Sequence, residues 1–114
     1  MKNILKQIID KKKEKIKIYK KEYHENRLID DIKNIKNSLN FRDIINKRSL
    51  EKKISIIAEI KKASPSAGII IENFNPLNIA KVYIENGAPF LSILTEEDFF
   101  LGKLEYIKNI KKYY

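Results

Sequence analysis

The sequence ISIIAEI at residues 54–60, followed by KKASPSAG at residues 61–68, decides the fold. The first part is a short run rich in β-branched side chains, and the second part contains the turn residues Pro65 and Gly68. A β-branched run that ends at such a loop is typical of a buried strand in a parallel sheet. We therefore predict a strand over residues 54–60 that leads directly into a loop.

The residues after this loop predict a helix. Asn75 is a good capping residue, and Pro76 after it suits the first helical position. An apolar stripe at helical spacing follows and stops at Gly87. The stripe consists of Leu77, Ala80 and Ile84. Strand, loop and helix together make one βα unit.

A second βα unit follows at once. Residues 90–94, FLSIL, predict a strand, and residues 95–98, TEED, predict a polar loop. A further helix is indicated by the spacing of Leu104, Ile107, Ile110 and Tyr114. Two βα units in tandem begin a parallel α/β structure. Two parallel strands cannot bury both of their faces or close a barrel, so we expect an architecture larger than these 114 residues.

The first 50 residues have a helical pattern throughout. Residues 2–22 predict a charged amphipathic helix, residues 28–39 a second helix and residues 41–45 a short third one. The sequence therefore predicts two parts. A helical extension covers residues 1–50, and an incomplete α/β domain of two βα units covers residues 51–114.

The composition argues against several kinds of site. The chain has no cysteine and one histidine, His24, so we expect no disulfide, no zinc site and no Ser/His triad. His24 lies in a polar helical context and is expected at the surface. The N-terminus lacks the apolar core of a signal peptide, and no 18-residue apolar span is present. These features predict a cytoplasmic protein without a membrane partner.

The formal net charge of +9 has two interpretations. Clustered Lys and Arg side chains could bind nucleic acid, anionic lipid or a phosphorylated substrate. The lysines are instead spread along the chain, mostly beside Ile and Asn, which favours solvated faces in a protein of biased composition. A basic nucleic-acid-binding module stays an alternative function, although no RNA-binding motif is present. The favoured interpretation has no nucleic-acid partner.

Glu59 and Lys61 are the first candidates for chemistry. Residues two apart on a strand share a face, so both side chains point the same way at the end of the predicted strand. In a parallel α/β barrel the active site lies at that end. A carboxylate beside an ammonium keeps the lysine charged and ready to bind an anion or donate a proton. An ordinary surface ion pair is the alternative.

The two predicted loops carry weaker signals. Residues 63–68 can present hydroxyl and amide groups to a phosphate or carboxylate, although they could equally form only a turn. Phe99 and Phe100 follow the second loop and could place a ring over a flat substrate. Core packing is the commoner role of two adjacent phenylalanines.

Two of these segments resemble a known family. The run from Ile56 to Ser66, with Gly68 behind it, closely resembles the first-strand signature of indole-3-glycerol phosphate synthases. Residues 91–102 are similar to the second-strand segment of the same family, in the right order and at the right separation. The lysine-rich region before residue 50 resembles its N-terminal extension. The resemblance therefore covers the whole chain and implies the start of a (β/α)8 barrel.

The resemblance also implies roles for six residues. Glu59 and Lys61 match the catalytic glutamate and lysine of the first strand. Ser64 and Pro65 match a substrate-lining loop, and Leu94 and Phe100 match an apolar pocket for the anthranilate-derived ring. The family closes and decarboxylates 1-(o-carboxyphenylamino)-1-deoxyribulose 5-phosphate in tryptophan biosynthesis, without a metal or organic cofactor. One departure is Ala67, where many relatives carry lysine.

The family's other functional groups lie on later strands. They include a second lysine that acts as general acid, a glutamate base and the groups that bind phosphate, and all of them fall beyond Tyr114. The chain alone is therefore expected to be inactive, and the missing C-terminal part of the barrel is its expected partner beside the phosphorylated substrate. The alternative is a truncated or decayed barrel fragment without catalysis.

Overall fold

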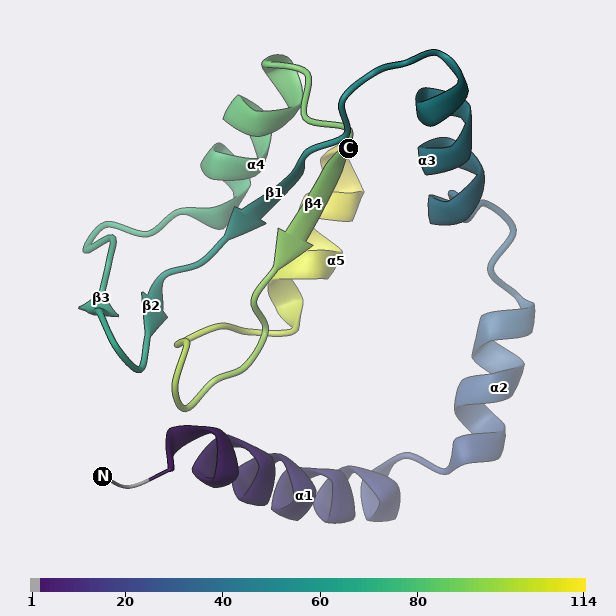
Figure 1. The fold of residues 1–114 in the computed structure, drawn as a ribbon. Helices are drawn as coiled ribbons and strands as arrows, with labels where there is room; N and C mark the ends of the chain where they lie inside the picture. Colours follow the sequence, from purple (N-terminus) through teal and green to yellow (C-terminus); the bar gives the residue numbers. More distant parts are fainter. Residues whose placement is uncertain (1–2) are drawn as a thin grey trace. The chain divides into compact units, whose positions relative to one another are not determined.

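The computed structural model describes residues 3–114, which form five α-helices and four β-strands (Figure 1). They are α1 (Ile4–Glu22), α2 (Glu25–Lys33), α3 (Phe41–Leu50), β1 (Ile57–Ile60), β2 (Ala63–Ser64), β3 (Gly68–Ile69), α4 (Pro76–Glu85), β4 (Phe90–Ile93) and α5 (Glu105–Tyr113). The chain divides into two compact units, Met1–Phe41 and Arg42–Tyr114. The boundary after residue 50 predicted for the extension and the barrel stays a prediction. None of the described helices is long and apolar enough to cross a bilayer.

The first unit contains α1 and α2. The helix predicted over residues 2–22 is confirmed as α1, although Met1 and Lys2 lie outside the described residues. Asn3 caps it, because its Oδ1 accepts a hydrogen bond from the Lys6 amide at 3.2 Å. His24 precedes α2 and is exposed, as expected.

The bounds predicted for α2, residues 28–39, were wrong. The helix begins earlier and ends at Lys33. The Asn34 side chain donates a hydrogen bond to the Asp30 carbonyl at 3.1 Å. The Ile35 amide donates one to the Ile32 carbonyl, also at 3.1 Å. The side-chain hydrogen bond to a helix carbonyl and the tighter turn after it end the helix, although no Gly or Pro is present there.

In the second unit, α3 is longer than the predicted residues 41–45. Its last turn is tied to the segment before β1 by Arg48, which donates to the Ile54 carbonyl at 2.8 Å and to the Ser55 hydroxyl at 3.1 Å. Lys52 adopts a left-handed conformation, φ 55°, directly after the helix. The Lys53 amide then bonds the Arg48 carbonyl at 2.9 Å, which closes the helix end.

The predicted parallel pairing is confirmed by β1 and β4. They pair in register from Ile57 opposite Phe90 to Ile60 opposite Ile93. The strand was predicted to begin at residue 54, but β1 begins at Ile57. Its partner β4 begins only at Phe90, so residues 54–56 do not extend this ladder. The pair establishes the α/β class of the unit.

The helix between the two strands agrees closely with its prediction. The Asn75 side chain accepts a hydrogen bond from the Asn78 amide at 3.1 Å, and Pro76 occupies the first turn of α4. Gly87 follows the helix with φ 86°, a conformation that costs other residues energy. The Ala88 amide then bonds the Tyr83 carbonyl at 2.9 Å. These groups return the chain to the start of β4.

One face of the β1–β4 pair is covered by helices, as Figure 1 shows for α4 and α5. Ile60 is 1% exposed there and packs with Ala80 of α4 and Ile110 of α5. Leu91 and Ile93 of β4 join this core. The Tyr83 hydroxyl on α4 also donates to the Glu59 carbonyl at 2.9 Å. The end of β1 is therefore fixed from the helix side.

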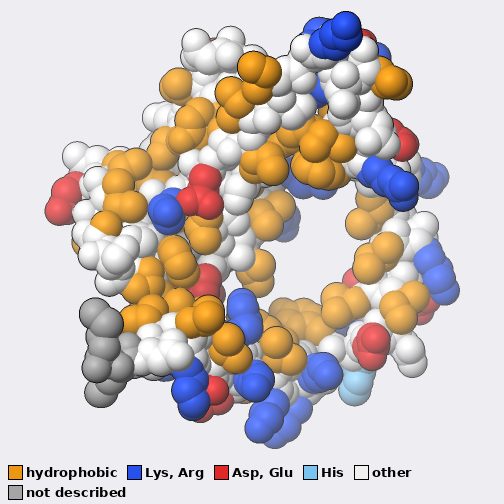
Figure 2. Space-filling model, in the orientation of Figure 1, with side chains coloured by type: hydrophobic (Ala, Val, Ile, Leu, Met, Phe, Trp, Pro, Cys, Tyr) orange, Lys and Arg blue, Asp and Glu red, His pale blue; other side chains and the backbone are white. Residues whose placement is uncertain are grey.

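The opposite face of β1 is open. Ile57, on this face, is 56% exposed. On the side drawn in Figure 2, hydrophobic side chains lie at the surface among Lys and Arg side chains. Within the second unit, the exposed Ile57 is therefore an apolar side chain at the surface of β1.

Alanine substitutions of the two β1 isoleucines should have different effects on stability, because the two side chains lie on opposite faces of the strand. In the chain alone, Ile60→Ala should lower the free energy of unfolding by about 2–5 kcal/mol, because it empties a packed position. Ile57→Ala, at an exposed position, should change the free energy of unfolding by less than about 1 kcal/mol. Urea unfolding of dilute protein, followed by far-ultraviolet circular dichroism, measures both. Equal losses would contradict the difference in burial between Ile60 and Ile57.

Candidate active site at the carboxyl ends of β1 and β4

The side chains of β1 and β4 alternate between two faces of the sheet, and the register shows which residues of the two strands share a face. Ile60 and its partner Ile93 face the helical core. Glu59 pairs with Ser92, so both side chains lie on the open face by strand alternation. Lys61 follows Ile60 and returns to the face of Glu59. The open face therefore carries a carboxylate, an ammonium and a hydroxyl at the carboxyl ends of the strands.

Glu59 and Lys61 form an ion pair on this face. Lys61 Nζ lies 2.9 Å from Glu59 Oε1, and the two side chains are 32% and 46% exposed, respectively. This confirms the predicted geometry of the pair. An ammonium carries three N–H donors, and the bond to Glu59 uses one of them. The carboxylate holds the lysine Nζ in position on this face. Such a lysine can bind an anion or donate a proton to a substrate.

Leu94 joins the same face. Its amide donates to the Ile60 carbonyl at 3.2 Å, so the parallel pairing continues past the end of β4. By alternation from Ser92, the Leu94 side chain lies on the face of Lys61. An apolar side chain therefore shares the face of the charged pair.

Ser64 and Pro65 lie in a hairpin that the sequence did not predict as strand. β2 and β3 pair antiparallel, and Gly68 with φ 66° closes the turn between them. The Ser64 hydroxyl accepts a hydrogen bond from the Ala67 amide at 3.1 Å and lies 3.4 Å from the Ser66 hydroxyl. The hairpin follows β1 at the end where Lys61 lies, so it holds an ordered loop next to the pair.

Phe100 lies in the loop between β4 and α5. This loop is organised by Glu96, a residue that the sequence analysis did not single out. The sequence predicts Glu96 only as part of a polar loop. Its carboxylate accepts hydrogen bonds from the amides of Asp98, Phe99 and Phe100 at 2.7–3.0 Å. The only sequence signal was a glutamate placed two to four residues before these amides, which many ordinary loops share.

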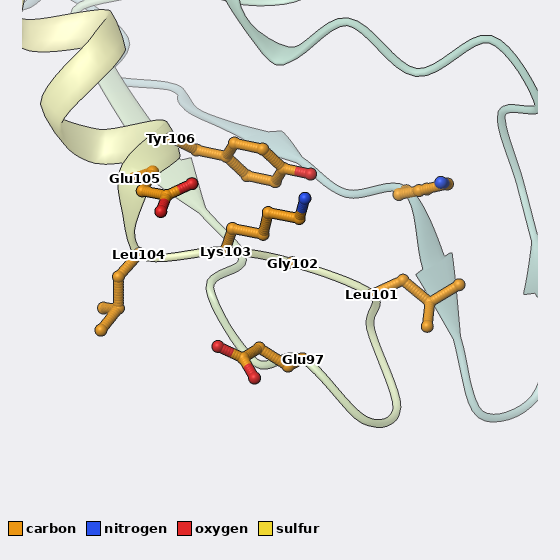
Figure 3. Close-up of a pocket in the computed structure, with 8 residues that line it drawn as sticks. Glu97, Leu101, Gly102, Lys103, Leu104, Glu105 and Tyr106 are labelled. Atoms are coloured by element: carbon orange, nitrogen blue, oxygen red, sulfur yellow. The ribbon is translucent and has the colours of Figure 1, made fainter. Parts of the chain in front are cut away.

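A separate hollow of about 660 Å³ lies beside this loop (Figure 3). It is lined by Lys62, Glu97, Leu101, Gly102, Lys103, Leu104, Glu105 and Tyr106. None of the six predicted site residues lines it. Figure 3 shows the Lys103 side chain directed toward the Tyr106 ring and hydroxyl. Lys62 therefore belongs to a different surface from Lys61, its neighbour in the sequence.

Within residues 3–114, no group of three or more His, Cys, Asp or Glu side chains is arranged to hold a metal ion.

Comparison with known proteins identifies the family to which this sequence is similar. The family model described as indole-3-glycerol phosphate synthase matches residues 5–114. The indole-3-glycerol phosphate synthase of Clostridium acetobutylicum is 55% identical over 85 residues, which cover 74% of this chain and 32% of that protein. The enzyme of that name from Aliarcobacter butzleri is 45% identical over 108 residues, 95% of this chain and 41% of that protein. The chain thus spans less than half the length of these relatives.

The exposure of the ion pair predicts a small role in stability. A pair this accessible to water contributes only about 0–1 kcal/mol. Glu59→Gln should therefore change the free energy of unfolding by less than about 1 kcal/mol, measured by urea unfolding. Lys53→Gln, which removes a comparable exposed pair with Glu51 at 2.7 Å, is the matched control. A loss several times larger at Glu59 would mean that the pair serves the fold.

Proposed function

The chain belongs to the indole-3-glycerol phosphate synthase family, and we propose that it supplies the first two βα units of the catalytic barrel of such an enzyme. The observation that carries this proposal is the 2.9 Å ion pair between Lys61 and Glu59, beyond the core-facing Ile60 at the carboxyl end of β1. In (β/α)8 barrels the active site lies at the carboxyl ends of the strands. Residues 1–50 form the proposed helical extension.

The open face of β1 and β4 supports the barrel interpretation. In a closed barrel the interior face of each strand is covered by the other strands, while helices cover the outside. The helices α4 and α5 cover the face of Ile60, so the face of Glu59 and Lys61 corresponds to the interior. Further βα units would cover Ile57 there. We propose that residues 51–114 are one part of this larger domain.

The proposed substrate is 1-(o-carboxyphenylamino)-1-deoxyribulose 5-phosphate. In the reaction, a carbon of the aromatic ring attacks the ribulose carbonyl while that carbonyl gains a proton. Carbon dioxide and water then leave, and indole-3-glycerol phosphate forms. These steps need a cation near the carboxylate and phosphate, a proton donor near the carbonyl and a flat apolar slot.

Lys61 meets the first of these needs and takes part in proton transfer in this proposal. Its bond to Glu59 at 2.9 Å sets its position. Leu94 and Phe100 are proposed to line the slot for the anthranilate-derived ring. Ser64 and Pro65 are proposed to line the entrance, where Ala67 in place of lysine removes one positive charge. The reaction is proposed to occur in the cytoplasm.

The remaining groups of the reaction come from later strands in this proposal. They are a second lysine as general acid, a glutamate base and the cradle for the phosphate. Because groups that act together lose nearly all activity when several are absent, Lys61 and Glu59 alone would not sustain turnover. The partner of this chain is therefore the rest of the barrel.

Complementation of a tryptophan auxotroph that lacks the synthase tests this proposal. Residues 1–114 expressed alone should not restore growth. Growth should return when the later part of the Clostridium acetobutylicum relative is joined to the chain as a hybrid or expressed separately. Size-exclusion chromatography should show the isolated chain associating, because it exposes apolar side chains such as Ile57 and the unpaired edges of a two-stranded sheet. Growth with the chain alone would overturn the need for the other units.

In the purified hybrid, Lys61→Ala should lower kcat/KM by about a hundredfold or more, since general acid–base groups contribute on that scale. Lys62→Ala is the matched control, because it removes the same charge from the hollow of Figure 3 rather than from the open face. We expect it to change kcat/KM less than threefold. Steady-state kinetics of indole-3-glycerol phosphate formation measure both. Equal losses would show that net charge, rather than a positioned lysine, accounts for the effect.

A further inference from the structure

The loop between β4 and α5 is organised around the Glu96 carboxylate. Its Oε1 accepts a hydrogen bond from the Asp98 amide at 2.9 Å. Its Oε2 accepts from the Phe99 amide at 2.7 Å and from the Phe100 amide at 3.0 Å. Glu96 is partly buried, and the Phe99 and Phe100 bonds are partly buried as well. Three successive backbone amides therefore converge on one carboxylate.

The backbone of Glu96 holds the other end of the loop. Its carbonyl accepts a hydrogen bond from the Gly102 amide at 2.7 Å. Gly102 itself is buried against the end of β4, because a Cβ there would overlap the Leu94 carbonyl oxygen and would lie 2.9 Å from the Thr95 Cα. Leu101 before it adopts a left-handed conformation, φ 53°. The chain thus leaves β4 and folds back onto it around Glu96.

A negative charge suits this arrangement better than a neutral side chain of the same shape. Amides that converge in a turn form an anion-binding concavity, and hydrogen bonds to an ionised acceptor are shorter and stronger than neutral ones. Glutamine would fill the same space but offers one carbonyl oxygen and one N–H donor group. In either orientation that group would face at least one amide donor of the loop.

Phe100 is one of the residues whose backbone this carboxylate holds. Its amide bonds Oε2, and so does the amide of Phe99 before it, so the backbone at Phe100 is held on two successive residues. The Phe100 side chain is therefore attached to a backbone whose position is set by Glu96. A ring that forms one wall of an apolar slot needs such a fixed backbone, since the loop has no helix or strand of its own between β4 and α5.

We propose that Glu96 is a positioning residue, which sets the Phe100 ring in the substrate slot through the backbone amides of the loop. This rests on the proposed function, in which Phe100 lines the slot for the aromatic part of the substrate. Glu96 does not touch the substrate. Its carboxylate binds backbone amides of its own loop, and it affects the reaction only through the position of the Phe100 ring.

The test uses the wild-type hybrid and its Glu96→Gln variant in two assays. Hydrogen exchange should show faster exchange of the loop amides in the variant, by about tenfold, while the amides of β1 and β4 keep their protection. Steady-state kinetics should show KM raised about fivefold or more with kcat within about twofold, because a binding wall common to ground and transition states is loosened. Glu85→Gln removes the same charge from an exposed pair with Lys81 on α4, away from this loop, and should leave both readouts unchanged.

A double-mutant cycle asks whether Glu96 acts through Phe100. Phe100→Leu alone should raise KM, and adding Glu96→Gln to it should raise KM no further, because the wall that Glu96 positions is already gone. If Glu96→Gln raises KM equally in both backgrounds, or lowers kcat alone, the positioning role through Phe100 is overturned. An unchanged rate of loop exchange would overturn the anchoring role.

The outcomes also separate this inference from the proposed function. An inactive wild-type hybrid would overturn the proposed function, and with it the role in substrate positioning. An active hybrid in which Glu96→Gln leaves KM unchanged would overturn only the role of Glu96. If the glutamine variant does not fold, Glu96→Asp, which retains the charge on a shorter side chain, should shift both readouts in the same direction by a smaller amount. No shift in the folded aspartate variant would contradict the requirement for a correctly placed carboxylate.

Discussion

Burial of Ile60 between two helices is the constraint on which the rest of the second unit depends. Ile60 packs against Ala80 of α4 and Ile110 of α5, and this fixes which face of β1 meets the helices. Because side chains alternate along a strand, Glu59 and Lys61 must then lie on the other face. The parallel register carries Ser92 to the same side. An apolar contact in the core thus places the polar residues of the candidate site.

Hydrogen bonds from α4 and from the loop after β4 hold the ends of the two strands in position. Tyr83 reaches from α4 to the Glu59 carbonyl, so the end of β1 is held at the residue that carries the carboxylate. Gly102 allows the second loop to pack against the Leu94 carbonyl, and Glu96 binds the amides of that loop. Hydrogen bonds within each βα unit therefore order the end of the sheet where the pair of charges lies.

Much of this arrangement could be predicted from the sequence, and the reasons are local. Asn75, Pro76 and Gly87 mark both ends of α4 by capping and by a left-handed turn, and the period of two predicted the shared face of Glu59 and Lys61. The end of α2 could not be predicted, because it depends on a single Asn34 side-chain bond. The bonds of Glu96 could not be predicted either, because they require the folded path of the loop to bring three amides together. The roles of Ser64, Pro65, Leu94 and Phe100 depend on strands outside these residues and stay predictions.

The central claim is that Lys61 faces the substrate inside a barrel while its neighbour Lys62 does not. Chemical acylation of the two lysines in the hybrid enzyme, quantified by mass spectrometry with and without substrate, tests it most directly. The account predicts that saturating substrate protects Lys61 and leaves the acylation rate of Lys62 unchanged. Equal protection of both lysines, or protection of Lys62 alone, would contradict it.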